Sequence, residues 1–274
     1  MRVEQLGTGT PEVAIVGGIH GDEPCGVRAV ERLLADDPAV ERPVKLVVAN
    51  EEALERGVRF VHADLNRSFD EAATDGGTGG HVHEHGLARR LADEIEGCTT
   101  LAIHSTQSYA EPFGIVDGTD EPVPSICPYL SIVALVDVDQ TVEGRPFALE
   151  ADMVEVEAGI QGSESAAENA YRLAREFLTA TGVLPGRTVG RDLPVYRLGP
   201  PIEKPRAAGY EVFVENFSRV GAGQPYAAAD GEEFAAEEAF YPVLMSAGGY
   251  ESIFGYAGER VGTLEAPSRE EQSV

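Results

Sequence analysis

The stretch 13–26 constrains the fold of this 274-residue chain more than any other. Its first four residues are apolar and mostly β-branched, which is typical of a strand buried on both faces. Two glycines then end the strand and allow a tight turn. His20 and Glu23 follow, where an open α/β sheet presents its ligand-binding crevice. An imidazole and a carboxylate in that place predict a transition-metal site, with zinc as the first choice.

The segments after this strand alternate between helix and strand patterns. Residues 26–35 place apolar side chains at helical spacing, and the apolar run 44–49 predicts a second buried strand. A strand, a helix and a strand of these lengths are typical of a parallel βαβ unit. Further strands are predicted at 99–106 and 152–159, followed by a helix from 163 to about 182. The chain is therefore predicted to have an α/β fold.

The pattern changes after residue 183, where short β-like pieces are separated by Gly, Pro and Asp turns. We therefore predict two domains. Residues 1–183 form the zinc-binding catalytic domain, and residues 184–274 form a small β-rich C-terminal domain.

A second strand end supplies a third candidate ligand. The strand predicted at 99–106 contains His104. A lone histidine at a strand end is usually structural or exposed. With His20 and Glu23 at another strand end, His104 becomes the natural third ligand, because two histidines and one glutamate with a position open for water form a known catalytic zinc arrangement.

The strand predicted at 152–159 carries two carboxylates, Glu155 and Glu157, on one face. One interpretation is a half-exposed edge strand, which is common in so acidic a chain. The other is that one carboxylate acts as general base toward a metal-activated water. Glu157 lies closer to the carboxyl end of the strand, where the site is expected, so we select Glu157 as the candidate base.

Residues 59–69 have little secondary-structure propensity and many hydrogen-bonding groups, which is typical of a functional loop. Arg67 can bind a carboxylate through two parallel hydrogen bonds, and Asn66 offers both a donor and an acceptor. On this segment alone, a solvated turn with surface charges is the favoured interpretation.

Three histidines, His81, His83 and His85, follow a glycine-rich loop at 74–80. Such a tract can bind metal, but exposed histidines at the start of an amphipathic helix are the commoner case. We predict that replacing all three with alanine leaves activity near the wild-type level. A large loss of bound metal in that variant would contradict this prediction.

The formal net charge of −26 argues against nucleic acid as a partner, because phosphate binding needs a basic face. The sequence contains no run of about 18 apolar residues, so we expect no membrane span. The N-terminus lacks the apolar stretch of a secretory signal, and the three cysteines lack paired metal-ligand spacing. We therefore expect a cytoplasmic protein with reduced thiols.

Five motifs, in order along most of the chain, resemble the succinylglutamate desuccinylase/aspartoacylase family of zinc-dependent deacylases. They lie at 18–24, 50–69, 104, 156–161 and 241–251. That family shares its catalytic fold with the zinc carboxypeptidases. The resemblance therefore implies a mixed, largely parallel sheet flanked by helices, with a smaller, mostly β C-terminal domain.

The resemblance also implies a role for each matched residue. The ligands of one Zn²⁺ ion per subunit are implied to be His20, Glu23 and His104. The catalytic residues are implied to be Glu157 as general base and Arg59 as the group that polarises the scissile carbonyl. The substrate-binding residues are implied to be Asn66, Arg67 and Tyr250. The chain departs from the family at Ala102, where members often have an aspartate, and the nearest arginine before Glu157 is Arg145.

The sequence thus predicts a zinc-dependent amidohydrolase that removes an N-acyl group from an N-acylated amino acid or a similar small molecule. One alternative is a carboxypeptidase-like metallopeptidase. Another is a non-catalytic, metal-stabilised binding protein, although Arg59 and Glu157 are not needed merely to hold zinc. The expected partner is the small-molecule substrate, and a homo-oligomer is compatible with the sequence.

Lysine is nearly absent, with only Lys45 and Lys204, whereas acidic residues are dispersed along the chain. This composition resembles that of proteins from extreme halophiles, which stay soluble through net charge. We predict that the melting temperature rises between low and molar potassium chloride, because salt screens the repulsion among the acidic side chains. Equal thermal stability at both salt concentrations would contradict this inference.

Overall fold

The computed structural model describes residues 1–69, 82–138 and 152–267. The helices and 3₁₀ turns are α1 (Cys25–Asp36), α2 (Glu51–Arg56), η1 (Leu65–Arg67), α4 (His83–Ile95), α5 (Val123–Ile126), η2 (Cys127–Tyr129) and α6 (Glu164–Ala180). The strands of the N-terminal part are β1 (Arg2–Leu6), β2 (Val13–Gly17), β3 (Val44–Val48), β4 (Thr99–Thr106), β5 (Phe113–Val116), β6 (Leu135–Asp137) and β7 (Met153–Ile160). The later strands are β8 (Leu193–Arg197), β9 (Pro201–Glu203), β10 (Tyr210–Val212), β11 (Pro225–Ala229), β12 (Glu232–Ala235), β13 (Tyr241–Val243) and β14 (Ile253–Leu264).

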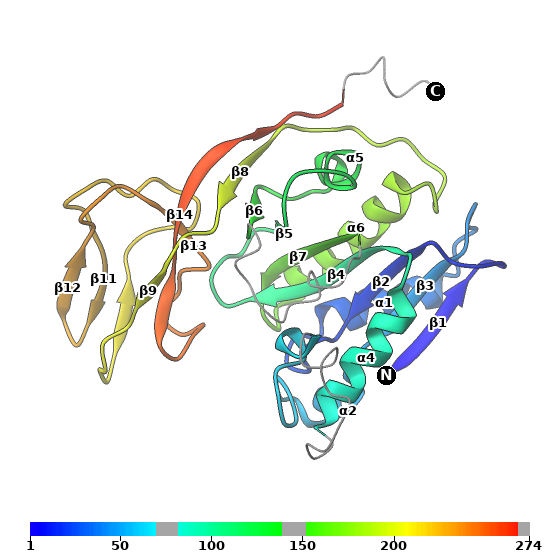
Figure 1. Cartoon of the computed structure of the whole chain (residues 1–274), viewed down its shortest axis with the longest axis horizontal. Helices are drawn as coiled ribbons and strands as arrows, with labels where there is room; N and C mark the ends of the chain where they lie inside the picture. The colour runs from blue at the N-terminus through cyan, green and yellow to red at the C-terminus, as the bar shows by residue number, and fades with distance from the viewer. Residues whose placement is uncertain (70–81, 139–151, 268–274) are drawn as a thin grey trace.

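A mixed sheet organises the described part of the chain, with the strand order β1-β3-β2-β4-β7-β5-β6-β8-β14-β13 (Figure 1). Strands β3, β2, β4 and β7 are parallel neighbours, and so are β5, β6 and β8. Antiparallel pairing joins β5 to β7 and closes both ends of the sheet. The predicted α/β fold with a mixed, largely parallel sheet is confirmed, as is the parallel βαβ unit formed by β2, α1 and β3.

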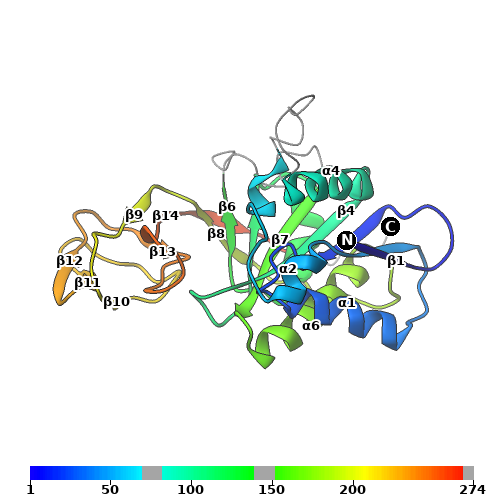
Figure 2. The ribbon, with the colours of Figure 1, turned by 90° about the horizontal axis from the view of Figure 1, so that it is seen from below.

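Helices cover both faces of the sheet, which explains why β2 is apolar and buried along its whole length. Figure 2 shows α1 and α6 on one face and α4 on the other. The apolar sides of α1 and α6 pack with β2 and β4 in one core, and the apolar side of α4 packs in a second. Ser163 caps the N-terminus of α6, since its hydroxyl accepts a hydrogen bond from the Ala166 amide at 3.1 Å.

The segment after α6 consists of strands and turns within the described residues, as the sequence predicted. Strands β10, β11 and β12 form a separate three-stranded sheet at the far end of the molecule from α4 (Figure 2). However, β8 pairs in parallel with β6, and β14 pairs with β8, so the main sheet continues past residue 183. Strands on both sides of residue 183 thus share one sheet, and the division into two domains at 183/184 stays a prediction.

The structure also bears on the expectations for the cysteines and for a membrane span. The cysteines Cys25, Cys98 and Cys127 are free and buried. No helix of the described residues is long and apolar enough to cross a membrane. The loop 74–80, His81 and Arg145 lie outside the described residues.

The side chain of Leu101 is fully buried in β4, at the centre of the sheet. We predict that Leu101→Ala lowers the free energy of unfolding by about 2–5 kcal/mol, because it leaves a cavity among close-packed neighbours. Chemical denaturation measures this loss. The control is Val189→Ala, at a side chain that is 81% exposed, which should change stability by less than about 0.5 kcal/mol. Equal effects of the two substitutions would contradict the assigned core.

Candidate metal centre and active site

The candidate site lies at the carboxyl ends of three parallel strands. The loop after β2 carries His20 and Glu23, β4 carries His104, and β7 carries Glu157. His104 pairs with Glu157 in the register of β4 and β7. Because parallel strands end at the same edge of a sheet, residues more than 130 positions apart in sequence meet there, as the sequence predicted.

Two glycines fix the path of the loop after β2. Gly18 has φ +68°, in the left-handed region that favours glycine. Gly21 lies against α2, where an added Cβ would be only 2.1 Å from the carbonyl carbon of Ala53. The Gly21 amide donates to the Arg59 carbonyl oxygen at 3.1 Å. The loop is thereby held between α2 and the segment that carries Arg59.

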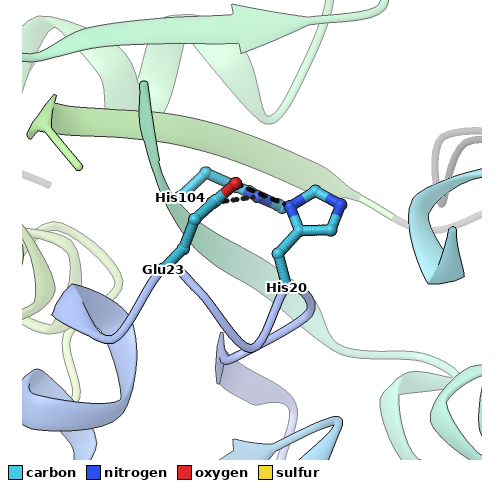
Figure 3. Close-up of side chains that lie close together, drawn as sticks. All are labelled: His20, Glu23 and His104. Atoms are coloured by element: carbon cyan, nitrogen blue, oxygen red, sulfur yellow. Dashed lines mark hydrogen bonds and ion pairs between the residues drawn. The ribbon is translucent and has the colours of Figure 1, made fainter. Parts of the chain in front are cut away.

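Three buried side chains converge at this loop (Figure 3). Glu23 Oε1 lies 2.8 Å from His20 Nδ1, and Glu23 Oε2 lies 3.1 Å from His104 Nδ1. One ligand atom from each residue falls within 4.8 Å of the other two. Two imidazole nitrogens and a carboxylate oxygen are a donor set that suits zinc, and the remaining position would stay open for water. The described residues therefore fit a metal of this kind.

Asp64 holds the other side of His20. Its Oδ1 lies 3.1 Å from His20 Nε2, and its Oδ2 accepts from Arg59 Nε at 3.2 Å. A carboxylate on the second nitrogen of a metal-binding histidine fixes the ring orientation and the tautomer. No pattern in the sequence singles out Asp64 as a partner of His20, although Asp64 opens the polar run that contains Asn66 and Arg67.

The charges in the cluster are strongly coupled. Burial disfavours the charged form of His20, but Glu23 and Asp64 outweigh it and raise the pKa of His20 to about 9. Burial also opposes ionisation of Glu23 and Asp64. Even so, the charge of His20 and a hydrogen bond from His104 hold the pKa of Glu23 well below its usual value, and contacts with His20 lower the pKa of Asp64. Both carboxylates are therefore in the anionic form that binds a cation.

Glu157 differs from these carboxylates. Burial and the nearby charge of Glu23 raise the pKa of Glu157 to about 7. Its Oε2 is buried without a hydrogen-bond partner among the described residues. The alternative of an exposed edge strand is wrong, because β7 lies between β4 and β5. A buried carboxyl that can both take and return a proton near neutral pH suits general acid–base chemistry.

The polar loop before η1 brings Arg59 to the cluster. Arg59 Nη1 donates to Glu23 Oε1 at 3.0 Å. Asn66 is buried, and Arg67 Nη1 donates to the Asn66 carbonyl oxygen at 3.0 Å. The solvated-turn interpretation is wrong for Leu65 and Asn66, which are buried, whereas the charged side chains of Arg59 and Arg67 are exposed.

The C-terminal strands contribute Tyr250, which lies between β13 and β14. Lys204 Nζ donates to the carbonyl oxygens of Ala247 and Tyr250 at 2.8 and 2.6 Å, which fixes this loop. The ring of Tyr250 packs edge-on against Tyr256. One of the two lysines in the chain thus holds a candidate substrate-binding residue in place.

All eight site residues predicted from the sequence line one cavity of about 430 Å³. Those residues are His20, Glu23, Arg59, Asn66, Arg67, His104, Glu157 and Tyr250. A larger hollow of about 1010 Å³ beside β9 and β12 contains none of them. His83 and His85 do not line the 430 Å³ cavity either.

Cys25 lies two residues after Glu23 but is not suited to attack a substrate. Its thiol is buried and donates to the His104 carbonyl oxygen at 3.4 Å. Burial raises the pKa of Cys25 to about 12, so the reactive thiolate is scarce.

Comparison with known proteins matches part of the chain to a described family. Residues 9–111, which include all three candidate ligands, match the family described as "Succinylglutamate desuccinylase/Aspartoacylase catalytic domain". This part of the chain is therefore similar to the catalytic domain of that family. The members of this family are hydrolytic deacylases. Comparison with curated protein sequences gave no match.

Several solved structures share the fold of this chain. The product-bound ectoine utilization protein EutE (DoeB) from Ruegeria pomeroyi matches with a TM-score of 0.75 and 17% identity, over 94% of this chain and 87% of that one. Murine aminoacylase 3 matches with a TM-score of 0.71 and 22% identity, over 96% and 100%. A succinylglutamate desuccinylase/aspartoacylase from Rhodobacter sphaeroides matches with a TM-score of 0.74 and 15% identity, over 94% and 89%.

We predict that Asp64→Asn lowers the zinc affinity about 10- to 100-fold, because the amide no longer holds His20 Nε2 with a charged acceptor. Competition with a chromogenic chelator measures the change. Asp120→Asn, at an exposed position away from the cavity, should bind zinc like the wild type. Equal affinities of the Asp64 and Asp120 variants would contradict the role of Asp64.

Proposed function

We propose that the protein is a zinc-dependent deacylase that hydrolyses the amide bond of an N-acylated amino acid or a similar small molecule. The observation that carries the proposal is the convergence of His20, Glu23 and His104 in the cavity that also contains Glu157 and Arg59. Metal binding alone would need only the first three. The other two are the groups that amide hydrolysis requires, namely a base and an oxyanion donor.

The three ligands would hold one Zn²⁺ per subunit, with His20 and His104 binding through Nδ1. When bound, zinc lowers the pKa of a coordinated water toward about 7 and polarises the acyl carbonyl. The carboxylate of Glu157 takes the proton from the attacking water and returns it to the leaving amine. The guanidinium of Arg59 donates to the developing oxyanion, a contribution of roughly 3–4 kcal/mol in other systems.

The remaining cavity residues favour a small, carboxylate-bearing substrate. Arg67 and Asn66 lie at the cavity wall, where a guanidinium and an amide can hold the carboxylate of an amino acid. Tyr250 approaches from the C-terminal strands, and a volume of about 430 Å³ suits a small molecule. The match of residues 9–111 to the succinylglutamate desuccinylase/aspartoacylase family supports the same reaction class, because that family is one of deacylases.

A substrate panel tests the proposal. The purified protein is offered N-acetyl, N-succinyl and longer N-acyl amino acids, as well as short peptides, at molar salt with and without a chelator. We expect hydrolysis of N-acyl amino acids that a chelator abolishes and added Zn²⁺ restores. Cleavage of peptides alone would indicate a metallopeptidase instead, and no hydrolysis with zinc bound would indicate a binding protein.

We predict that Glu157→Gln lowers kcat by about 10²- to 10⁴-fold, because the amide cannot accept the proton of the attacking water. Bound zinc, measured by elemental analysis, should stay at the wild-type level. Glu164→Gln, at a side chain that is 85% exposed, is the control and should retain full activity. Full activity of the Glu157 variant would refute this residue as the general base.

A further inference from the structure

We propose that Glu84 is a positioning residue that holds the loop carrying Arg59 and Asp64 against the metal centre. Glu84 belongs to the first turn of α4, on the face of the sheet that is not covered by α1 and α6 (Figure 2). Its side chain does not line the cavity of about 430 Å³. The catalytic part of this proposal rests on the proposed function, whereas its structural part does not.

The Glu84 carboxylate accepts hydrogen bonds from three successive backbone amides. The amide of Val61 donates to Oε1 at 2.6 Å, and the amides of His62 and Ala63 donate to Oε2 at 3.2 Å each. Glu84 is 0% exposed. A buried carboxylate is costly unless hydrogen bonds compensate its lost hydration. These amides supply that compensation, and they lower the pKa of Glu84.

The loop needs such an anchor because it has no regular structure of its own. Residues 57–64 lie between the end of α2 and the start of η1. At one end, the Arg59 carbonyl oxygen accepts from the Gly21 amide. The amides of residues 61–63, which donate to Glu84, lie between Arg59 and Asp64 in the sequence. Both side chains that reach the metal centre are therefore attached to a backbone segment that Glu84 fixes.

Asn50 joins the same network to the metal-binding loop. It is fully buried, and its Nδ2 donates to Glu84 Oε1 at 3.4 Å. Its Oδ1 accepts from the Ala53 amide as the N-cap of α2, and its own amide donates to the Gly18 carbonyl oxygen at 2.9 Å. The Glu84 carboxylate thus has a fixed position relative to the loop that carries His20.

This arrangement gives a specific expectation for Glu84→Gln. The glutamine keeps the size of the side chain, but its NH₂ group would face backbone amides that also donate, so the loop must shift. Because a displacement of about 1 Å can reduce a rate about 10²-fold, kcat should fall about 10- to 100-fold. The ligands His20, Glu23 and His104 lie on other segments, so zinc content at saturating Zn²⁺ should stay unchanged, and KM should change less than about twofold.

Two measurements test the anchor against a merely structural role, with Asp93→Asn as the matched control on the exposed face of α4. Hydrogen exchange should show faster exchange of the amides 61–63 in Glu84→Gln and unchanged exchange in β4 and β7. A double-mutant cycle compares the effect of Glu84→Gln on kcat in the wild type and in Arg59→Ala. The effect should largely disappear in Arg59→Ala, because that variant lacks the guanidinium whose position Glu84 is proposed to fix. Asp93→Asn should match the wild type in both measurements.

The outcomes separate this proposal from the proposed function. An inactive wild-type protein would refute the deacylase, whereas unchanged exchange at 61–63 in Glu84→Gln would refute the anchor. Additive effects of Glu84→Gln and Arg59→Ala would overturn the action through Arg59. If Glu84→Gln does not fold, Glu84→Asp keeps the charge on a shorter side chain, and the proposal then requires faster exchange at 61–63 with a smaller loss of kcat.

Discussion

The contact on which the site depends is the double engagement of the Glu23 carboxylate by two buried imidazoles. One oxygen meets His20 and the other meets His104, from a different strand. Taking a carboxylate out of water is unfavourable unless cations or donors surround it. The Ser105 amide and Arg59 complete that surrounding, with contacts of 3.1 and 3.0 Å. A divalent cation between these donors would add the positive charge that such a cluster favours.

The main sheet brings the candidate metal ligands and the candidate base together and fixes their relative positions. Because β2, β4 and β7 are adjacent and parallel, their carboxyl ends form one edge, and side chains from distant parts of the sequence meet there. Hydrogen-bonded strands are rigid supports for His104 and Glu157, whereas His20 and Glu23 lie on the short loop after β2. Arg59, Asp64 and Tyr250 also come from loops, which are held by buried or half-buried side chains such as Glu84 and Lys204.

The sequence predicted much of this arrangement because its signals are local. Apolar runs that end in glycine or histidine identify strands and their carboxyl ends, so His20, Glu23 and His104 could be selected together. A period of two placed Glu157 on the site face. Asp64 was missed because its partner His20 is 44 residues away, and Glu84 was missed because it binds backbone amides, which no side-chain pattern reveals. The parallel pairing of β8 with β6 was missed for a similar reason, since β8 looks like an isolated short strand.

Anomalous X-ray scattering at the zinc edge, on crystals of the zinc-loaded protein, tests this metal site directly. We expect one zinc peak per subunit, within coordination distance of His20 Nδ1, a Glu23 carboxylate oxygen and His104 Nδ1. A peak elsewhere, or a zinc ion beyond the reach of His104, would contradict this expectation.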